Sequence, residues 1–291
     1  MRSAARSRGL SITIGQVESP AETAGCFAHV LPVLGEADWH YQPGKPDAQG
    51  AHLALNSLQA AAEWTVRGEA AGIVTGPIAK SLLAAIGFEH PGQTEFVAAA
   101  SGVAADHAVM MLAGPSLRTV PLTVHCALGE VPGRLSRELV VARSRIVADA
   151  LRKDFGIAVP RLAIAGLNPH AGESGRMGTE DRDIVALAVQ ILKISGIDAS
   201  GPHPADTMFA PRARATYDVA IAMYHDQALI PLKALDFDQG VNVTLGLEIV
   251  RTSPDHGTAF DIAGKGIAEP GAMIAALRMA GEIARRRGIN P

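Results

Sequence analysis

Two hydrophobic patterns alternate along the chain, one typical of buried strands and the other of amphipathic helices. Short apolar runs, often rich in β-branched residues, predict strands at residues 71–76, 108–113, 119–125, 161–167, 218–223 and 241–247. Apolar residues at three-to-four spacing predict helices at residues 50–66, 78–86, 133–154, 180–196 and 270–287. Because the two kinds of element alternate, we expect an α/β fold in which helices connect parallel strands. The Pro/Gly/Asp-rich residues 35–50 are predicted to form a surface loop or linker.

Three of the predicted strands deliver a histidine at their carboxyl end. His125 ends one strand, His170 follows a second, and His225 follows a third after one tyrosine. In open α/β sheets ligands bind just beyond these strand ends, and neutral imidazole ligates zinc and other divalent transition metals. The histidines are 45 and 55 residues apart, so they meet only if their strands are neighbours. The pattern leaves two interpretations open, a divalent-metal site or three unrelated histidines with ordinary hydrogen bonds.

The composition narrows the class of protein without identifying it. The 291 residues are 48% hydrophobic and 19% charged, as in an ordinary globular enzyme. A net charge of −3 excludes a basic surface for nucleic acid, and no apolar run approaches the ~18 residues of a membrane span. The two cysteines, Cys26 and Cys126, lie far apart in the sequence, which favours a reduced, cytoplasmic protein. The basic residues 285–287 are expected to end a helix and to complement its dipole.

The stretch 73–96 combines a predicted strand with glycines and polar side chains. Lys80 lies early in a predicted helix, where a solvated lysine is the ordinary interpretation. The later Gly92-Gln93-Thr94-Glu95 supplies an amide and a hydroxyl at a probable helix start. Such a helix start suits a phosphate or a carboxylate, but Thr94 could equally cap only the helix backbone.

The stretch 241–270 has the highest density of polar residues in the chain. Asn242 and Arg251 lie there beside a Thr/Gly loop. The rigid guanidinium of Arg251 can bind a phosphate or a carboxylate through two hydrogen bonds, although a structural ion pair is the commoner role of an isolated arginine. No GxGxxG follows a first strand, so any dinucleotide binds without the Rossmann fingerprint.

A series of longer motifs identifies a family. In order along residues 71–280 the chain contains GPIAK, GQTEF, LNPHAGE, ADTMF, AMYHDQ, VNVTLGL and RTSPDHGTA. This series resembles the 4-hydroxythreonine-4-phosphate dehydrogenase family of vitamin B6 biosynthesis. The resemblance implies an isocitrate/isopropylmalate dehydrogenase-like fold of two α/β/α domains with the active site in the cleft between them. It implies a cofactor-side domain of residues 1–86 plus 238–291, and a domain of residues 87–237 for metal, substrate and dimerisation.

The resemblance also implies a reaction and a set of site residues. The reaction is the oxidation of 4-phosphooxy-L-threonine with NAD or NADP to a 3-oxo acid, which decarboxylates to 3-amino-2-oxopropyl phosphate. One divalent cation (zinc, cobalt, manganese or magnesium) would be shared across the interface of a homodimer, held by His125, His170 and His225, with His225 from the other subunit. The other implied roles are substrate contacts at Gln93, Thr94, Lys233, Asn242 and Arg251, and cofactor contacts at His256, Gly257, Thr258 and Ala259. The expected proton acceptor is Asp226 or Lys233.

The chain departs from the family's motifs at two places. Gln93 stands where the family usually has a histidine, so we expect a substrate phosphate to be held less strongly there. A GDPAGIGPE-like turn after a first strand has no counterpart before residue 70. We therefore expect a cofactor-side domain without that strand and helix, with an exposed sheet edge. Two alternatives stay open: a dehydrogenase of another diol or phosphorylated sugar acid, and a catalytically silent homologue.

Overall fold

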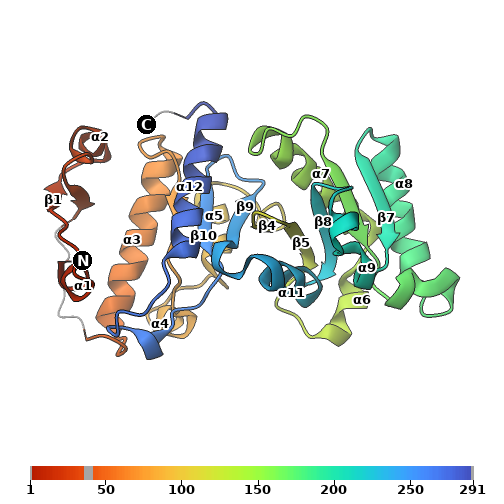
Figure 1. Cartoon of the computed structure of the whole chain (residues 1–291), viewed down its shortest axis with the longest axis horizontal. Coiled ribbons are helices and arrows are strands. Elements are labelled where there is room, and N and C mark those ends of the chain that lie inside the picture. Colours follow the sequence, from red (N-terminus) through yellow and green to blue (C-terminus); the bar gives the residue numbers. More distant parts are fainter. Residues whose placement is uncertain (1, 36–41, 290–291) are drawn as a thin grey trace.

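An eight-stranded mixed sheet runs through most of the computed structural model, which describes residues 2–35 and 42–289 (Figure 1). In spatial order its strands are β3 (Ile73–Val74), β10 (Arg251–Pro254), β9 (Val241–Leu245), β4 (Val109–Ala113), β5 (Arg118–Thr123), β8 (Val219–Tyr224), β6 (Arg161–Ala165) and β7 (Asp198–His203). Strand β9 is antiparallel to both of its neighbours, and β4 is antiparallel to β5. The remaining pairs are parallel.

Helices cover both faces of this sheet. The longer ones are α3 (Ala48–Val66), α4 (Lys80–Ala85), α5 (Gln93–Ala100), α7 (Arg137–Lys153), α8 (Ala186–Ile194), α11 (His225–Asp236) and α12 (Gly271–Arg286). Buried residues of α7, α8 and α12 form one continuous core with the sheet, so these three helices share a face. On the other face α11 packs over β8 and β6, and α3 and α5 pack near β3. The short helices are α1 (Arg2–Ser7), α2 (Thr23–Cys26), α6 (Val131–Arg134), α9 (Ala205–Met208) and α10 (Pro211–Arg214).

The predicted strands and helices are all present, with ends shifted by a few residues. The predicted helix 180–196 begins as a π-helical turn, Asp181–Val185, and continues as α8. The expectation of a parallel sheet is wrong at its centre. Only four residues connect β4 to β5, and a parallel crossover needs a dozen or more, so the two strands form an antiparallel hairpin. Strands β7 and β10 and helix α11 were not predicted, whereas the helix start expected at residues 92–95 is confirmed by α5.

Two further strands precede α3, where none was predicted. Strands β1 (Ile14–Val17) and β2 (Leu31–Leu34) pair in parallel as a separate two-stranded sheet, which lies beyond α3 in Figure 1. The predicted loop 35–50 lies partly outside the described residues, and its last three residues, 48–50, begin α3. None of the helices in the described part of the chain is long and apolar enough to cross a membrane.

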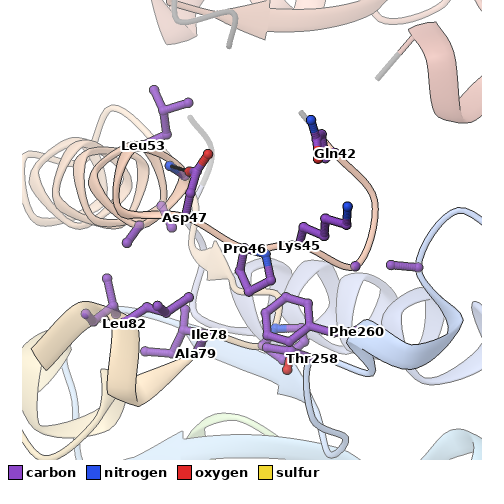
Figure 2. A pocket seen from close by; sticks show the side chains of 17 residues that line it. Gln42, Lys45, Pro46, Asp47, Leu53, Ile78, Ala79, Leu82, Thr258 and Phe260 are labelled. Carbon is purple, nitrogen blue, oxygen red and sulfur yellow. Dashed lines mark hydrogen bonds between the residues drawn. The ribbon is translucent and has the colours of Figure 1, made fainter. Parts of the chain in front are cut away.

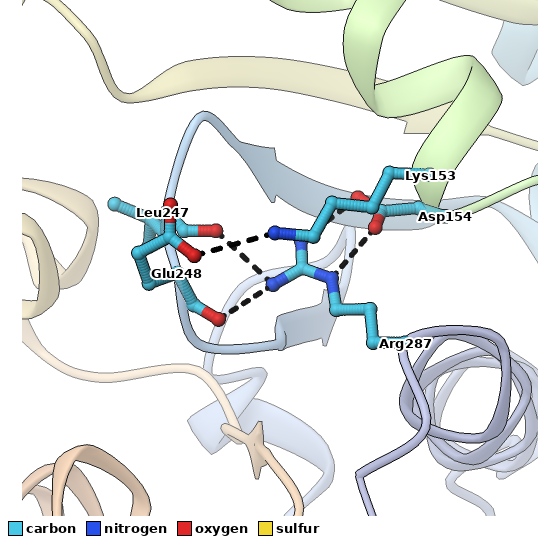
Figure 3. A network of polar contacts seen from close by, with 5 residues as sticks. All are labelled: Lys153, Asp154, Leu247, Glu248 and Arg287. Carbon is cyan, nitrogen blue, oxygen red and sulfur yellow. Dashed lines mark hydrogen bonds and ion pairs between the residues drawn. The ribbon is translucent and has the colours of Figure 1, made fainter.

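The predicted domain boundary falls between β9 and β4, where the sheet is continuous. The two strands pair in antiparallel fashion from Val109 opposite Leu245 to Ala113 opposite Val241. A buried ion pair crosses the same boundary: Arg287, which caps α12, donates to both carboxylate oxygens of Asp154 at the end of α7, at 2.6 and 2.9 Å (Figure 3). Arg287 therefore lies at the end of a helix, as expected. Its guanidinium also forms a buried ion pair, which the expected interaction with the helix dipole did not include.

Candidate active site

The parallel strands β5, β8 and β6 are neighbours, so their carboxyl ends lie along one edge of the sheet. His125 lies two residues beyond β5, and His225 is the first residue of α11, directly after β8. Their ring centroids are 6.3 Å apart. The strand order therefore brings two of the three predicted histidines together in one chain.

The third histidine lies elsewhere. His170 is exposed and does not line the cavity that contains the other two. Within the part of the chain that the structure describes, no three His, Cys, Asp or Glu side chains form a group that could hold a metal ion. A complete three-histidine site is therefore absent from the described residues of a single chain.

A cavity of about 430 Å³ opens beside the two histidines. It is bounded by the turn after β3, the starts of α4 and α5, helix α11 and the loop after β10. The polar side chains that line it are Lys80, Gln93, Thr94, Glu95, His125, His225, Lys233, Asn242, Arg251, Ser253, Asp255 and His256. Three cationic side chains and two carboxylates are among them, so with neutral histidines the lining carries a net positive charge.

Arg251 forms the buried end of this cavity, with only 5% of its surface exposed. Its Nη1 donates to the hydroxyls of Thr244 and Thr94, at 3.1 and 3.4 Å, and its Nη2 donates to Thr75 and Gln93, at 3.1 and 3.0 Å. All four acceptors are neutral. Burial lowers the pKa of Arg251 to about 10, opposed by the charge of Glu95, so the guanidinium is still cationic at neutral pH.

Gln93 holds Arg251 in place. Its Oε1 accepts the hydrogen bond from Arg251, and its Nε2 donates to the carbonyl of Gly76 at 3.1 Å. Both polar ends of the amide are therefore engaged within the chain. Gln93 lines the cavity as predicted, but its contacts orient the guanidinium.

Buried polar atoms without partners gather at the same place. Asn242 Oδ1 and Arg251 Nε are both buried and make no hydrogen bond in the described structure. Buried polar groups in folded proteins are nearly always paired, and unpaired ones mark functional positions. Nearby, Lys233 Nζ forms an ion pair with Asp255 Oδ2 at 3.2 Å. The lining of the cavity therefore includes a buried guanidinium, an amide and a lysine–carboxylate pair.

The electrostatic surroundings of His125 keep its imidazole neutral. Burial lowers the pKa of His125, and repulsion from Lys80, and from His225 whenever that ring is protonated, lowers it further, while Glu95 acts in the opposite direction. A neutral imidazole has a lone pair available for a metal ion or a proton. The backbone of His125 has φ of 51°, a left-handed conformation that costs a non-glycine residue energy and that often accompanies functional positions.

Asp226 orients His225 from outside the cavity. Its Oδ1 lies 2.7 Å from His225 Nδ1, and Asp226 itself does not line the cavity. Because an ionised carboxylate only accepts hydrogen bonds, Nδ1 carries the proton and Nε2 keeps its lone pair. Of the two predicted proton acceptors, the structure therefore places Lys233 in the cavity and Asp226 behind an imidazole.

His170 begins a left-handed turn held by one buried carboxylate. From His170 to Ser174 every residue has a positive φ, although only Gly172 is a glycine. Asp181, 1% exposed, accepts hydrogen bonds from the backbone amides of Leu167 and Asn168, at 2.6 and 3.1 Å. The Asn168 side chain also donates to Asp181, at 3.0 Å. These contacts fix the start of the turn that carries His170 on the surface.

The predicted cofactor loop connects this cavity to a second one. His256 and Gly257 line the first cavity, and Thr258 lines a neighbouring cavity of about 490 Å³. Figure 2 shows Thr258 and Phe260 reaching this second cavity from the loop after β10, with Lys45 and Asp47 reaching it from the segment before α3. Pro77 and Ile78 line both cavities, so the two are adjacent.

The predicted site residues thus separate into two groups. The first cavity contains Gln93, Thr94, His125, His225, Lys233, Asn242, Arg251, His256 and Gly257, and it does not contain His170, Asp226, Thr258 or Ala259. Lys80, Glu95 and Asp255 also line it and were not predicted as site residues. Lys80 belongs to the GPIAK motif after β3, but β3 runs opposite to β5 and β8 in the sheet, so the rule that places ligands at strand ends gave no signal for it.

Comparison with known proteins identifies the family of this chain. A family model described as "Pyridoxal phosphate biosynthetic protein PdxA" matches residues 1–280. The 4-hydroxythreonine-4-phosphate dehydrogenase of Erythrobacter litoralis is 61% identical over 287 residues, covering 99% of this chain and 85% of that protein. The protein of the same name from Caulobacter vibrioides is 50% identical over 290 residues, covering 97% and 86%.

Solved structures share the fold. The crystal structure of 4-hydroxythreonine-4-phosphate dehydrogenase from Klebsiella pneumoniae has a TM-score of 0.84 and 34% identity, covering 97% of this chain and 86% of that one. A terephthalate 1,2-cis-dihydrodiol dehydrogenase from Burkholderia xenovorans has a TM-score of 0.63 and 29% identity, with the same coverage of both chains.

Proposed function

Because the chain belongs to the PdxA family of pyridoxal phosphate biosynthetic proteins, we propose that it oxidises 4-phosphooxy-L-threonine with a nicotinamide dinucleotide and a divalent metal. The names of its relatives support a 4-hydroxythreonine-4-phosphate dehydrogenase of pyridoxal phosphate biosynthesis. The proposed product is a 3-oxo acid, which loses carbon dioxide to give 3-amino-2-oxopropyl phosphate.

One observation carries this proposal: a pair of histidines and a buried, cationic arginine share a single cavity. Arg251 and Asn242 both line this cavity, and each has a buried side-chain atom, Nε and Oδ1, without a hydrogen-bond partner among the described residues. A phosphate or carboxylate suits the guanidinium, and an ammonium or hydroxyl suits the amide oxygen. An amino acid phosphate has all of these groups on a short chain. The residues therefore match the substrate's chemistry group by group.

The two histidines fit a divalent metal. His125 is neutral and His225 keeps its Nε2 lone pair, so both imidazoles can act as ligands. Nitrogen ligands suit zinc, cobalt and manganese better than magnesium. A cation held there would polarise the substrate hydroxyl and ease its deprotonation. Asp226 fixes the orientation of His225 in this role.

Lys233 is the proposed proton acceptor. It lies in the cavity, and its ammonium is paired with Asp255 at 3.2 Å, which places a second titratable group behind it. A lysine that has lost its proton can take the proton of the substrate hydroxyl, and Asp255 stabilises the ammonium that results. Asp226, outside the cavity, acts as a positioning residue.

The second cavity is the proposed site for the adenosine half of NAD or NADP. It adjoins the first through Pro77 and Ile78, and the loop from His256 to Thr258 lines both. A dinucleotide lying across this junction supplies the hydride acceptor beside the substrate. Ala259, whose φ is 47°, turns the loop between Thr258 and Phe260, which both line the second cavity.

A homodimer supplies the third histidine in this proposal. His125 and His225 lie in the cavity of the same chain, so in this proposal the third metal ligand is His170 of the partner subunit. The family resemblance implied instead that His225 is the histidine contributed by the partner. Apolar side chains that follow His125 and His225 along the chain are exposed, namely Leu128 at 67%, Ile230 at 64% and Phe237 at 73%. Such a surface is typical of a subunit interface.

Subunit mixing tests which histidine is shared. If His170 of the partner subunit completes each site, mixing His125→Ala with His170→Ala gives heterodimers with one intact site and about half of wild-type activity. A mixture of His125→Ala with His225→Ala stays inactive, because every site then has a lesion. Recovery in the second mixture and not in the first would instead place His225 across the interface.

The reaction itself is tested by assaying the purified protein with NAD and with NADP before and after chelation. We expect turnover of 4-phosphooxy-L-threonine that chelation abolishes and that zinc, cobalt or manganese restores. Unchanged turnover without metal would contradict the mechanism. Faster turnover of a non-phosphorylated diol than of the phosphorylated substrate would point to the alternative that Gln93 raises, a dehydrogenase of another diol.

A further inference from the structure

Lys80 is a cation of the cavity that has no assigned role. It is the first residue of α4, follows the turn after β3, and lines the cavity together with His125 and Arg251. Within residues 2–35 and 42–289, it makes no hydrogen bond or ion pair. Its ammonium therefore has three donors available to whatever occupies the cavity.

The other two cations of the cavity already have partners. Lys233 is paired with Asp255, and both Nη atoms of Arg251 donate to side-chain oxygens. Glu95 is a carboxylate that lines the same cavity as Lys80. The two side chains approach each other above Gly92, where a Cβ would lie 3.0 Å from Glu95 Oε2 and 3.6 Å from Lys80 Nζ, yet they form no ion pair. Among the described residues, Lys80 thus has no carboxylate partner within ion-pair distance.

The position of Lys80 points to an anion at the junction of the two cavities. Pro77 and Ile78 line both cavities, and Lys80 follows Ile78 by two residues (Figure 2 labels Ile78). The first cavity has a net positive lining, which includes the buried guanidinium of Arg251. An anionic ligand would neutralise this charge.

We propose that Lys80 binds a phosphate oxygen of the ligand, either in the phosphate monoester of the substrate or in the diphosphate of the dinucleotide. This inference rests on the proposed function for the identity of those ligands. The interaction itself requires only that the cavity receive a phosphate.

Equilibrium binding of inorganic phosphate and of inorganic diphosphate, measured by calorimetry, tests the proposal without turnover. Lys80→Met should weaken binding of at least one probe about tenfold or more, because it removes a hydrogen bond between two charged groups. Lys80→Arg keeps the charge and should retain most of the affinity. Lys193→Met is the matched control, because it removes the same charge from α8, outside both cavities.

Steady-state kinetics then separate the two sources of phosphate. A higher KM for 4-phosphooxy-L-threonine alone in Lys80→Met assigns the substrate phosphate, and a higher KM for the dinucleotide alone assigns the diphosphate. The proposal is overturned if Lys80→Met binds phosphate and diphosphate as tightly as the wild type does. It is also overturned if Lys193→Met weakens binding as much as Lys80→Met does, or if the wild type binds neither probe. If Lys80-dependent phosphate binding is found without turnover, the proposed reaction fails while the phosphate site stands.

Discussion

Asp226 accepts a hydrogen bond from Nδ1 of the adjacent His225 at 2.7 Å, which leaves the other ring nitrogen of that histidine free. A carboxylate behind a histidine fixes the tautomer and the ring orientation, and losing such a partner typically weakens metal binding about 10–100-fold. We therefore expect Asp226→Ala to raise the dissociation constant for zinc by about that factor, measured calorimetrically with the metal alone.

The control for this variant is Asp206→Asn, which removes a carboxylate on α9 that does not line the cavity. It should bind zinc as the wild type does. If Asp226→Ala also binds zinc with wild-type affinity, the orienting role is wrong. A loss of turnover without a loss of metal affinity would return Asp226 to the role of proton acceptor.

His125 should titrate below the ordinary histidine range in the metal-free protein. Burial disfavours the imidazolium, and Lys80 adds repulsion, so the pKa lies below the ordinary histidine value of 6.5. The folded state thus binds fewer protons at this site than the unfolded state. The corresponding stability is present above pH 6.5 and is lost as pH falls through the lower folded pKa.

Nuclear magnetic resonance of the His125 ring measures this pKa directly. Because the charge of Lys80 lowers the value and that of Glu95 raises it, Lys80→Met should shift the titration to higher pH and Glu95→Gln to lower pH. Shifts of the opposite sign would show that the two side chains do not face the imidazole as the structure has them.

Arg251→Lys should impair substrate binding while preserving the charge. A lysine cannot reproduce the hydrogen bonds to Thr75, Thr244 and Gln93 together with a contact to the ligand, because it lacks the planar fork. We expect KM for the phosphorylated substrate to rise about 10–100-fold, as for the loss of a charged hydrogen bond. Unchanged KM, in a variant whose thermal unfolding matches wild type, would exclude Arg251 from substrate binding.

The sequence predicted that His125 and His225 belong to the site, because ligands in open α/β sheets bind at the carboxyl ends of the strands. Strands β5, β8 and β6 follow the apolar pattern of buried parallel strands, and their carboxyl ends must lie together once they are neighbours. His125 and His225 meet for that reason. The direction of His170 could not be predicted, because it depends on a left-handed turn held by Asp181, which lies 14 residues after Leu167.

Other elements were missed where tertiary contacts override the local pattern. Strand β10 has the sequence RTSP, which is polar, yet all four of its residues are buried, with Arg251 satisfied by hydroxyls and an amide from other elements. Helix α11 begins in a polar cluster and contains Pro231. Lys80 was interpreted as a solvated lysine because no local pattern shows that α4 starts beside the sheet edge.

The ion pair between Arg287 and Asp154 yields a prediction about stability. Both side chains are nearly inaccessible, 5% and 2% exposed, and Arg287 Nη1 also donates to the carbonyls of Leu247 and Glu248, at 3.1 and 2.8 Å (Figure 3). Removing one partner leaves the other charge buried and unpaired, which typically costs about 3–5 kcal/mol. Arg287→Met and Asp154→Asn should each lower the free energy of unfolding by about that amount in urea denaturation.

The adjacent surface pair provides the control and the double mutant provides the decisive comparison. Lys153 and Glu248 are 3.3 Å apart but 50% and 87% exposed, so Lys153→Met should change stability by no more than about 1 kcal/mol. The double variant of Arg287 and Asp154 should lose clearly less than the sum of the two single losses, because neither charge is then left alone. Strictly additive losses would mean that the two residues stabilise the protein independently, and that the carbonyl contacts of Arg287 alone hold the end of α12 against the loop between β9 and β10.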